Sequence, residues 1–252
     1  MTAAAASVDL GRMHGRRREL AGRFLRGQGV EIGALHQPLW VPPGVQVTYV
    51  DRMDVAGLRS HYPELAALPL TRVDRIDDGE TLATFPDASL DFVVANHMLE
   101  HCENPIGTVR RHLAKLRPGG VLYYAVPDKR KTFDARRPLT DWAHLEADDR
   151  DGPAGSREGH FREYVALVEN APPGEPLEAR VRQLMAMNYS IHFHVWDAMS
   201  FGDFVEKLRG RLGFTVEVLE ENELEVVTVL RKPGRSAAGS VRGGWWRRLL
   251  GG

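Results

Sequence analysis

The stretch VEIGALHQPLW, residues 30–40, has the pattern of a buried strand that runs into a ligand-binding turn. Its first residues are apolar, Glu31 brings a carboxylate to the end of the strand, and Gly33 opens the turn. Nucleotide cofactor sites in wound sheets begin in this way, usually with further glycines that let the backbone approach the ligand. Leu35 stands where another glycine is expected, so the sequence predicts either a modified path for the turn or weaker binding.

The composition is that of a soluble globular protein. The 252 residues suffice for one large α/β domain or two small ones, and they are 43% hydrophobic and 27% charged. The formal net charge of -1 gives no overall attraction to nucleic acid. Residues 12–26 and 231–248 are rich in arginine, but solvated helix faces and a solubilising tail explain such runs. We therefore expect no nucleic-acid partner.

Two further features bear on where the protein works. The single cysteine, Cys102, cannot form an internal disulfide, and no apolar leader is found, so we expect a cytoplasmic protein. Residues 233–252 are rich in Gly, Ser and Arg and predict a flexible basic tail. Its segment WWRRLL, residues 245–250, favours either a frayed terminus or weak contact with an anionic membrane surface.

Strand and helix patterns alternate along most of the chain. A basic helix is expected over 12–26, within an N-terminal segment of residues 1–28. The helix that begins after Asn104 is the clearest, because Asn104 is a good N-cap and Pro105 suits the first turn. Helix-length crossovers separate five strand patterns, of which one begins at Gly29 and the others lie at 47–51, 70–74, 90–96 and 121–127. This order predicts an α/β fold with a doubly wound, mainly parallel sheet, helices on both faces, and a ligand site at the carboxyl ends of the strands.

The second half of the chain adds an insertion and a hairpin. Residues 128–200 are predicted to form an inserted cap after strand five, with a few helices that include one near 178–187. A helical stripe from Phe201 to Leu212 is closed by Gly213. Residues 214–232 then predict two antiparallel strands, so one domain of residues 29–232 would hold a seven-stranded sheet with an antiparallel last strand.

Acidic residues follow three successive strand patterns. These are Glu31, Asp51 and the pair Asp77 and Asp78. Carboxylates there suit a ligand that presents hydroxyl and amine groups, such as a ribose diol, and suit polyphosphates poorly. Neither a G-x-G-x-x-G turn nor a G-x-x-x-x-G-K-[ST] loop is present, so dinucleotides and nucleoside triphosphates are disfavoured.

Four segments in this order resemble the successive motifs of the S-adenosylmethionine-dependent methyltransferases with the seven-stranded Rossmann-like fold. They are VEIGA, YVDRMD, DDGETLATFPDASLDFVVANHMLEH and LRPGGVLYYAVPD, and the resemblance covers about residues 29–127. It implies S-adenosylmethionine as cofactor. By position it implies that Glu31 and Gly33 hold the methionine end, Asp51 the ribose hydroxyls and Asp78 the adenine amine. The neighbouring residues Ala34, Arg52 and Asn96 complete the predicted cofactor site.

Methyl transfer to a hydroxyl benefits from a general base near the cofactor's methyl group. His97 directly follows the fourth strand and is the first choice for this base, although a histidine that merely ends a strand is an alternative. Asp128 and His144 are further catalytic candidates. Arg130, Arg137, His192 and His194 are predicted to bind the substrate, and the cationic side chains favour an acidic or phosphorylated acceptor unless they are only solvated loop charges.

The sequence also contains candidate metal ligands near the end of the predicted cap. His192 and His194 alternate along the chain and would point to the same side, where His144 or Asp197 would complete a ligand set. No cysteine cluster or H-E-x-x-H motif supports it, so the sequence predicts no metal.

The sequence therefore predicts an S-adenosylmethionine-dependent enzyme, most specifically an O-methyltransferase with a small-molecule or carbohydrate acceptor. The runs VPDKRKTFDARRPLT and HFHVWD resemble a bacterial subgroup associated with surface-glycan assembly. Two other readings stay open, since fold alone does not determine function: a non-catalytic scaffold that keeps the fold, and a nicotinamide-dependent oxidoreductase.

Overall fold

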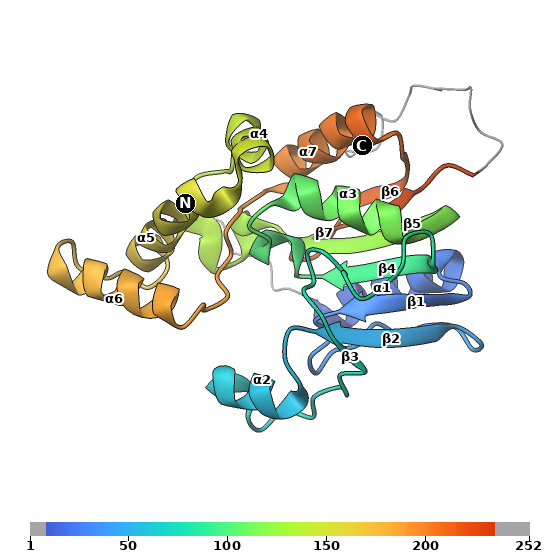
Figure 1. The fold of residues 1–252 in the computed structure, drawn as a ribbon, viewed down its shortest axis with the longest axis horizontal. Coiled ribbons are helices and arrows are strands. Elements are labelled where there is room, and N and C mark those ends of the chain that lie inside the picture. Colours follow the sequence, from blue (N-terminus) through green and yellow to red (C-terminus); the bar gives the residue numbers. More distant parts are fainter. Residues whose placement is uncertain (1–8, 235–252) are drawn as a thin grey trace.

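The computed structural model describes residues 9–234, which form one seven-stranded sheet with helices packed against it (Figure 1). The strands are β1 (Gln28–Ile32), β2 (Gln46–Asp51), β3 (Arg75–Ile76), β4 (Leu90–Asn96), β5 (Leu116–Pro127), β6 (Thr215–Asn222) and β7 (Glu225–Arg231). The helices are α1 (Leu10–Phe24), α2 (Val55–His61), α3 (Pro105–Lys115), α4 (Trp142–Asp151), α5 (Arg157–Leu167), α6 (Glu175–Ala186) and α7 (Ala198–Leu212).

The strand order is β3-β2-β1-β4-β5-β7-β6. Strands β1 to β5 pair in parallel, whereas β7 runs antiparallel to both β5 and β6. The order reverses between β1 and β4, the switch point at which wound sheets bind ligands beyond the carboxyl ends of their strands. The predicted α/β fold with a mainly parallel seven-stranded sheet and an antiparallel last strand is confirmed.

Two local predictions are wrong. Residues 70–74 do not form a strand, because β3 is the two-residue segment Arg75–Ile76 at the sheet edge, and both of its residues are exposed. The fifth strand is longer than the predicted 121–127, because it also includes residues 116–120 with Gly119 and Gly120. Helix α3 ends at Lys115, and β5 begins at once at Leu116, with a register shift against β4 that takes up the glycines.

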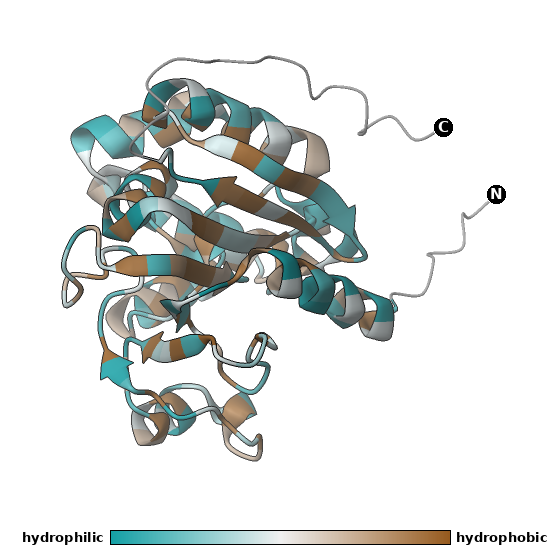
Figure 2. Cartoon of the chain, turned by 90° about the vertical axis from the view of Figure 1, so that its right-hand side faces the viewer, coloured by the Kyte–Doolittle hydropathy of each residue, from teal (hydrophilic) through white to brown (hydrophobic). Residues whose placement is uncertain are grey.

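The two faces of the sheet are covered by different elements. One face packs against α3 and α7, where Ile106, Val109 and Phe201 meet the buried strand residues. The other face packs against α1 through Leu20 and Phe24. Figure 2 shows brown, apolar residues concentrated in the strands between these layers. The helix predicted over 12–26 is therefore part of the sheet's packing.

The insertion after β5 contains α4, α5 and α6 and extends beyond the sheet (Figure 1). Helices α5 and α6 bury an apolar cluster of their own, which includes Phe161, Val181 and Phe193. The helix predicted near 178–187 is α6. We call residues 128–197 the cap.

The segment WWRRLL, with its predicted membrane-surface contact, lies outside the described residues. Across residues 9–234, no helix combines the length and the apolar character that crossing a membrane requires.

Candidate active site

A cavity of about 530 Å³ opens at the carboxyl ends of β1, β2 and β4. Its volume lies within the range of small-ligand sites. Gly33, Asp51, Asp78 and His97 all line it, and the cap contributes Phe193. Residues that are far apart in the sequence thus share one cleft at the switch point of the sheet.

The turn after β1 accommodates Leu35 at the position where a glycine is expected. Gly33 and Leu35 both adopt left-handed backbone conformations, with φ of 64° and 47°. Leu35 therefore follows the path that a glycine would take, and its carbonyl accepts a hydrogen bond of 2.6 Å from the Thr71 backbone N–H. A Cβ built on Gly33 meets no atom within 4 Å, so the backbone there borders open space. Gly33 therefore leaves room for a ligand, and Leu35 lines the same cavity.

Glu31 shapes this turn instead of lining the cavity. Its carboxylate is only 2% exposed and accepts the Leu39 N–H at 2.9 and 3.1 Å. Burial raises the pKa of Glu31 to about 7, although the Leu39 hydrogen bond opposes the shift. Glu31 therefore supports the turn, and its contact with the cofactor stays a prediction. Ala34 also acts within the turn, because its carbonyl accepts the Gln37 N–H at 2.9 Å.

Asp51 and Arg52 form the wall at the end of β2. One Asp51 oxygen accepts the Arg52 backbone N–H at 2.7 Å, and burial raises the pKa of this carboxyl group. The Arg52 guanidinium donates to Tyr62 Oη at 2.6 Å and to the Asn188 carbonyl at 3.2 Å. Arg52 therefore links β2 to the cap across the cavity.

The two acids after β3 have separate roles. Asp78 lines the cavity, and its Oδ1 accepts the Glu80 N–H at 2.8 Å. Asp77 instead accepts the Thr84 N–H and hydroxyl at 2.9 and 2.7 Å and closes its own loop. Asp78 is thus the acid of the pair that is available to a ligand.

His97 is held by a buried carboxylate that the sequence analysis missed. Its Nε2 lies 2.8 Å from Glu225 Oε2, and its φ of 52° places a non-glycine residue in the left-handed region. Glu225 is fully buried and also accepts Arg17 Nε at 2.8 Å. Burial alone would raise the pKa of Glu225, but the hydrogen bonds from His97 and Arg17 outweigh it and lower the pKa to about 2. The carboxylate therefore stays ionised and holds the proton on Nε2, which leaves Nδ1 as the basic nitrogen.

A second histidine, His101, also lines the cavity. Its Nδ1 donates to the Ile191 carbonyl at 2.9 Å, and burial, with His192 nearby, puts its pKa well below the usual value. Glu100 beside it is buried, and neither of its oxygens has a hydrogen-bond partner within residues 9–234. Burial therefore raises the pKa of Glu100 well above the usual value.

The comparisons with known proteins identify the family. A family model described as a methyltransferase domain matches residues 19–165, which is more than half of the chain. The chain belongs to this methyltransferase family. It is an S-adenosylmethionine-dependent methyltransferase, and the alternative of a non-catalytic scaffold is not favoured.

No curated protein sequence matches the chain. Solved structures similar to it include a methyltransferase dependent on S-adenosylmethionine from Aquifex aeolicus, with 12% identity and a TM-score of 0.46 over 88% of this chain and 93% of that one. Another is an O-methyltransferase family protein from Burkholderia thailandensis, with 15% identity and a TM-score of 0.48 over 88% of this chain and 56% of that one.

The residues of the methyltransferase cavity fit this cofactor. Gly33 leaves open space for a ligand, and the Asp51 and Asp78 carboxylates suit the ribose hydroxyls and the adenine amine. Asn96, next to His97, does not line the cavity, although its buried amide has no hydrogen-bond partner in the described part of the chain, so its predicted cofactor contact stays a prediction.

The predicted acceptor-binding cations do not line the cavity. Asp128 is fully buried and binds Arg130, whose Nε lies 2.9 Å from Asp128 Oδ1. Arg137 is also buried and donates to Asp134 at 2.9 Å and to Glu163 at 2.8 Å. The charges after β5 thus neutralise one another away from the cavity, and the catalytic role of Asp128 and the substrate contacts of Arg130 and Arg137 stay predictions.

The predicted pairing of His192 with His194 is wrong. His192 Nδ1 lies 2.6 Å from Asp134 Oδ2 and faces His101. His194 lies instead against His144 and His160, and Asp197 is the N-cap of α7. Residues 190–196 do not form a strand of the sheet, so alternation along the chain does not place the two rings on one side. Neither these two histidines nor His144 lines the cavity.

Proposed function

We propose that this methyltransferase transfers a methyl group to a hydroxyl of a small-molecule or carbohydrate acceptor. The observation that supports it is the pair of His97 and Glu225 at the cavity. A hydroxyl is a weak nucleophile until it loses its proton, whereas soft or already anionic nucleophiles need no base. A histidine whose second nitrogen is held by a buried carboxylate is the arrangement that removes such a proton.

The chemistry divides between the cofactor and the chain. When bound, S-adenosylmethionine supplies a methyl group on a positively charged sulfur. His97 Nδ1 would accept the proton that the acceptor hydroxyl loses as it takes up this methyl group. The ionised Glu225 stabilises the imidazolium that results, because its pKa of about 2 keeps it negatively charged at neutral pH.

The charges of the cavity favour a neutral acceptor. Arg52 is the only lysine or arginine among the lining residues, and it is bound to Tyr62 and Asn188. Acidic residues outnumber it, since Asp51, Asp78 and other carboxylates line the same space. A phosphorylated or acidic acceptor would meet repulsion there, so the acceptor class narrows to neutral hydroxyl compounds such as unphosphorylated sugars.

The test is transfer of labelled methyl groups to a panel of neutral sugars and glycan precursors. His97→Ala should lower kcat by roughly 10²- to 10⁴-fold, the usual contribution of a general base. The dissociation constant of S-adenosylmethionine should stay unchanged in calorimetry. The matched control is His14→Ala, an exposed residue of α1, which should retain full activity. Wild-type turnover in the His97 variant, or transfer only to amines or thiols, would reject the proposal.

A further inference from the structure

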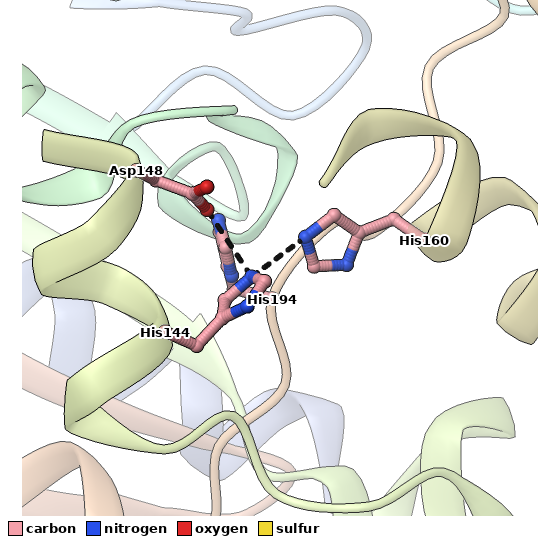
Figure 3. Close-up of side chains that lie close together, drawn as sticks. All are labelled: His144, Asp148, His160 and His194. Atoms are coloured by element: carbon pink, nitrogen blue, oxygen red, sulfur yellow. Dashed lines mark hydrogen bonds and ion pairs between the residues drawn. The ribbon is translucent and has the colours of Figure 1, made fainter. Parts of the chain in front are cut away.

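Four side chains that commonly bind metals converge in the cap (Figure 3). His144 and Asp148 lie one turn apart on α4, His160 lies on α5, and His194 lies in the segment before α7. One ligand atom from each lies within 4.8 Å of the others. We call these four residues the cap cluster. None of them lines the methyltransferase cavity.

Hydrogen bonds within the cap cluster do not satisfy its polar atoms. His144 Nε2 lies 2.9 Å from His160 Nε2, so these two nitrogens share one proton. His194 Nδ1 and Asp148 Oδ2 are buried and have no hydrogen-bond partner within residues 9–234. Asp148 Oδ2 lies 3.1 Å from His144 Nε2, but the His144 proton cannot serve both neighbours. A buried polar atom without a partner costs free energy, so a further ligand is expected between these side chains.

Residues outside the cap cluster hold two of its side chains so that His194 Nδ1 and Asp148 Oδ2 stay without a partner. His194 is fully buried, and its Nε2 donates to the Glu103 carbonyl at 3.3 Å, which leaves Nδ1 without a proton. The Ser156 hydroxyl donates to Asp148 Oδ1 at 2.7 Å, which leaves Oδ2 for the cluster. Such outer hydrogen bonds are the usual support of metal-binding histidines and carboxylates.

We propose that the cap cluster binds one zinc ion. Three imidazole nitrogens and one carboxylate oxygen form a complete tetrahedral set for zinc. Bonds of about 2.0–2.1 Å would separate the ligand atoms by about 3.3 Å, so zinc binding would draw together atoms that now lie within 4.8 Å of one another. Because four protein ligands leave no open position, the ion is structural and ties α4, α5 and the segment before α7 together.

The charge states of the histidines agree with this assignment. Burial, with His144 nearby, lowers the pKa of His160 to about 4. Burial, with His160 nearby, holds the pKa of His194 well below its usual value. Both imidazoles are therefore neutral at physiological pH, which is the form that binds a metal.

A second group of residues provides the matched control. Glu100, His101 and His192 also place ligand atoms within 4.8 Å of one another, but they number three and leave a position open. His101 faces the methyltransferase cavity, so an ion there would lie beside the reaction centre. The two groups use different residues, and single substitutions distinguish them.

The experiment measures zinc in the full-length chain, purified without a histidine tag, loaded with zinc sulfate and desalted. Elemental analysis should find one zinc ion per chain in the wild type and in Glu100→Gln. His160→Gln should hold none, and zinc should raise the Tm of the wild type but not of this variant. X-ray absorption of the loaded wild type should count three imidazole ligands, and this readout decides the question even if His160→Gln does not fold.

Three outcomes overturn the proposal. They are a wild type without zinc after loading, zinc that is retained in His160→Gln but lost in Glu100→Gln, and an X-ray absorption spectrum with two or fewer imidazole ligands. None of these readouts depends on methyl transfer, so the zinc site and the proposed acceptor are tested separately.

Discussion

Two residues at the cavity adopt backbone conformations that their side chains disfavour. Leu35 and His97 have φ of 47° and 52°, and such non-glycine positions cost on the order of 1–3 kcal/mol each. Backbone strain of this kind persists where the surrounding structure holds the residue in place, often at a functional site. The purpose at His97 is to direct one nitrogen to Glu225 and leave the other free. At Leu35 it is to carry the chain around the cavity wall beside Gly33.

The Asp51 carboxylate should make a large contribution to cofactor binding. It lines the cavity at the end of β2, where it accepts the Arg52 backbone N–H. Asp51→Ala should weaken S-adenosylmethionine binding by about 1.5–3 kcal/mol, the range for hydrogen bonds to charged groups, or roughly 10- to 150-fold in Kd. Calorimetric titration measures this directly.

The control for Asp51 is Asp74→Ala. Asp74 lies at the same sheet edge but binds Tyr49 N at 3.0 Å and Arg72 Nε at 2.6 Å, away from the cavity. Its loss should leave Kd unchanged. Equal effects of the two substitutions would show that general charge, not contact with the ribose, accounts for the change.

Among the elements, those with strong local signals were predictable. Helix α3 begins where Asn104 and Pro105 indicate, and α7 ends at Leu212, directly before its C-cap Gly213, whose φ is 72°. Strand β3 was misplaced because two exposed residues carry no apolar pattern, and their pairing with β2 alone defines the strand.

The candidate site was predictable only in its local parts. Asp51, Asp78 and His97 follow strands directly, so their position at the cavity follows from the order of the strands. Glu225 begins β7, which pairs with β5 from about one hundred residues away in the sequence, and Arg17 approaches it from α1. No pattern in the sequence indicates which acid of the hairpin meets His97. The pairing of Arg137 with Asp134 is equally invisible before folding.

Helix α1 should stabilise the protein through one arginine in particular. Arg17 is 7% exposed and binds the fully buried Glu225 with both Nε and Nη2. Arg17→Met removes the cation but leaves the carboxylate buried, so the free energy of unfolding should fall by about 3–5 kcal/mol. Arg16→Met is the control, because its pair with Glu220 is partly exposed and should contribute at most about 1 kcal/mol. Urea denaturation measures both, and similar losses would contradict the special role of Arg17.

In the whole molecule, histidines with a lowered pKa lie both at the sheet and in the cap. His112 lies between α3 and the sheet, His101 lies at the cavity, and His160 and His194 lie in the cap. Burial is the largest cause of the lowered pKa of each. Their uncharged state is thus a shared requirement of the folded protein, and acid should weaken all of these regions together.

The pH dependence of stability tests this at His112. Burial lowers the pKa of His112 from 6.5 to about 4, and its ring binds Tyr124 Oη and the Gly79 carbonyl, both at 2.7 Å. Above pH 6.5 His112 is neutral in both states, so its contribution to stability is complete. As the pH falls from 6.5 to 4, His112 is protonated in the unfolded chain but not in the folded protein. The free energy of unfolding therefore falls by on the order of 3 kcal/mol. The pKa of Glu31 is raised to about 7, so its contribution to stability increases as the pH falls from 7 to 4.5. The effect of His112 is therefore isolated by comparing the wild type with a His112 variant, since both contain Glu31.

His112→Asn should therefore be less stable than the wild type at pH 7.5 because it loses at least one buried hydrogen bond. Its free energy of unfolding should nevertheless change less steeply between pH 6.5 and 4, by the equivalent of one proton, or about 1.4 kcal/mol per pH unit at most. Urea denaturation at several pH values, with a chelator present so that metal release does not contribute, gives both slopes. Parallel slopes would mean that His112 takes up its proton in the folded protein at its ordinary pKa. Burial would then not keep His112 neutral, and the same claim for the cap histidines would need its own test.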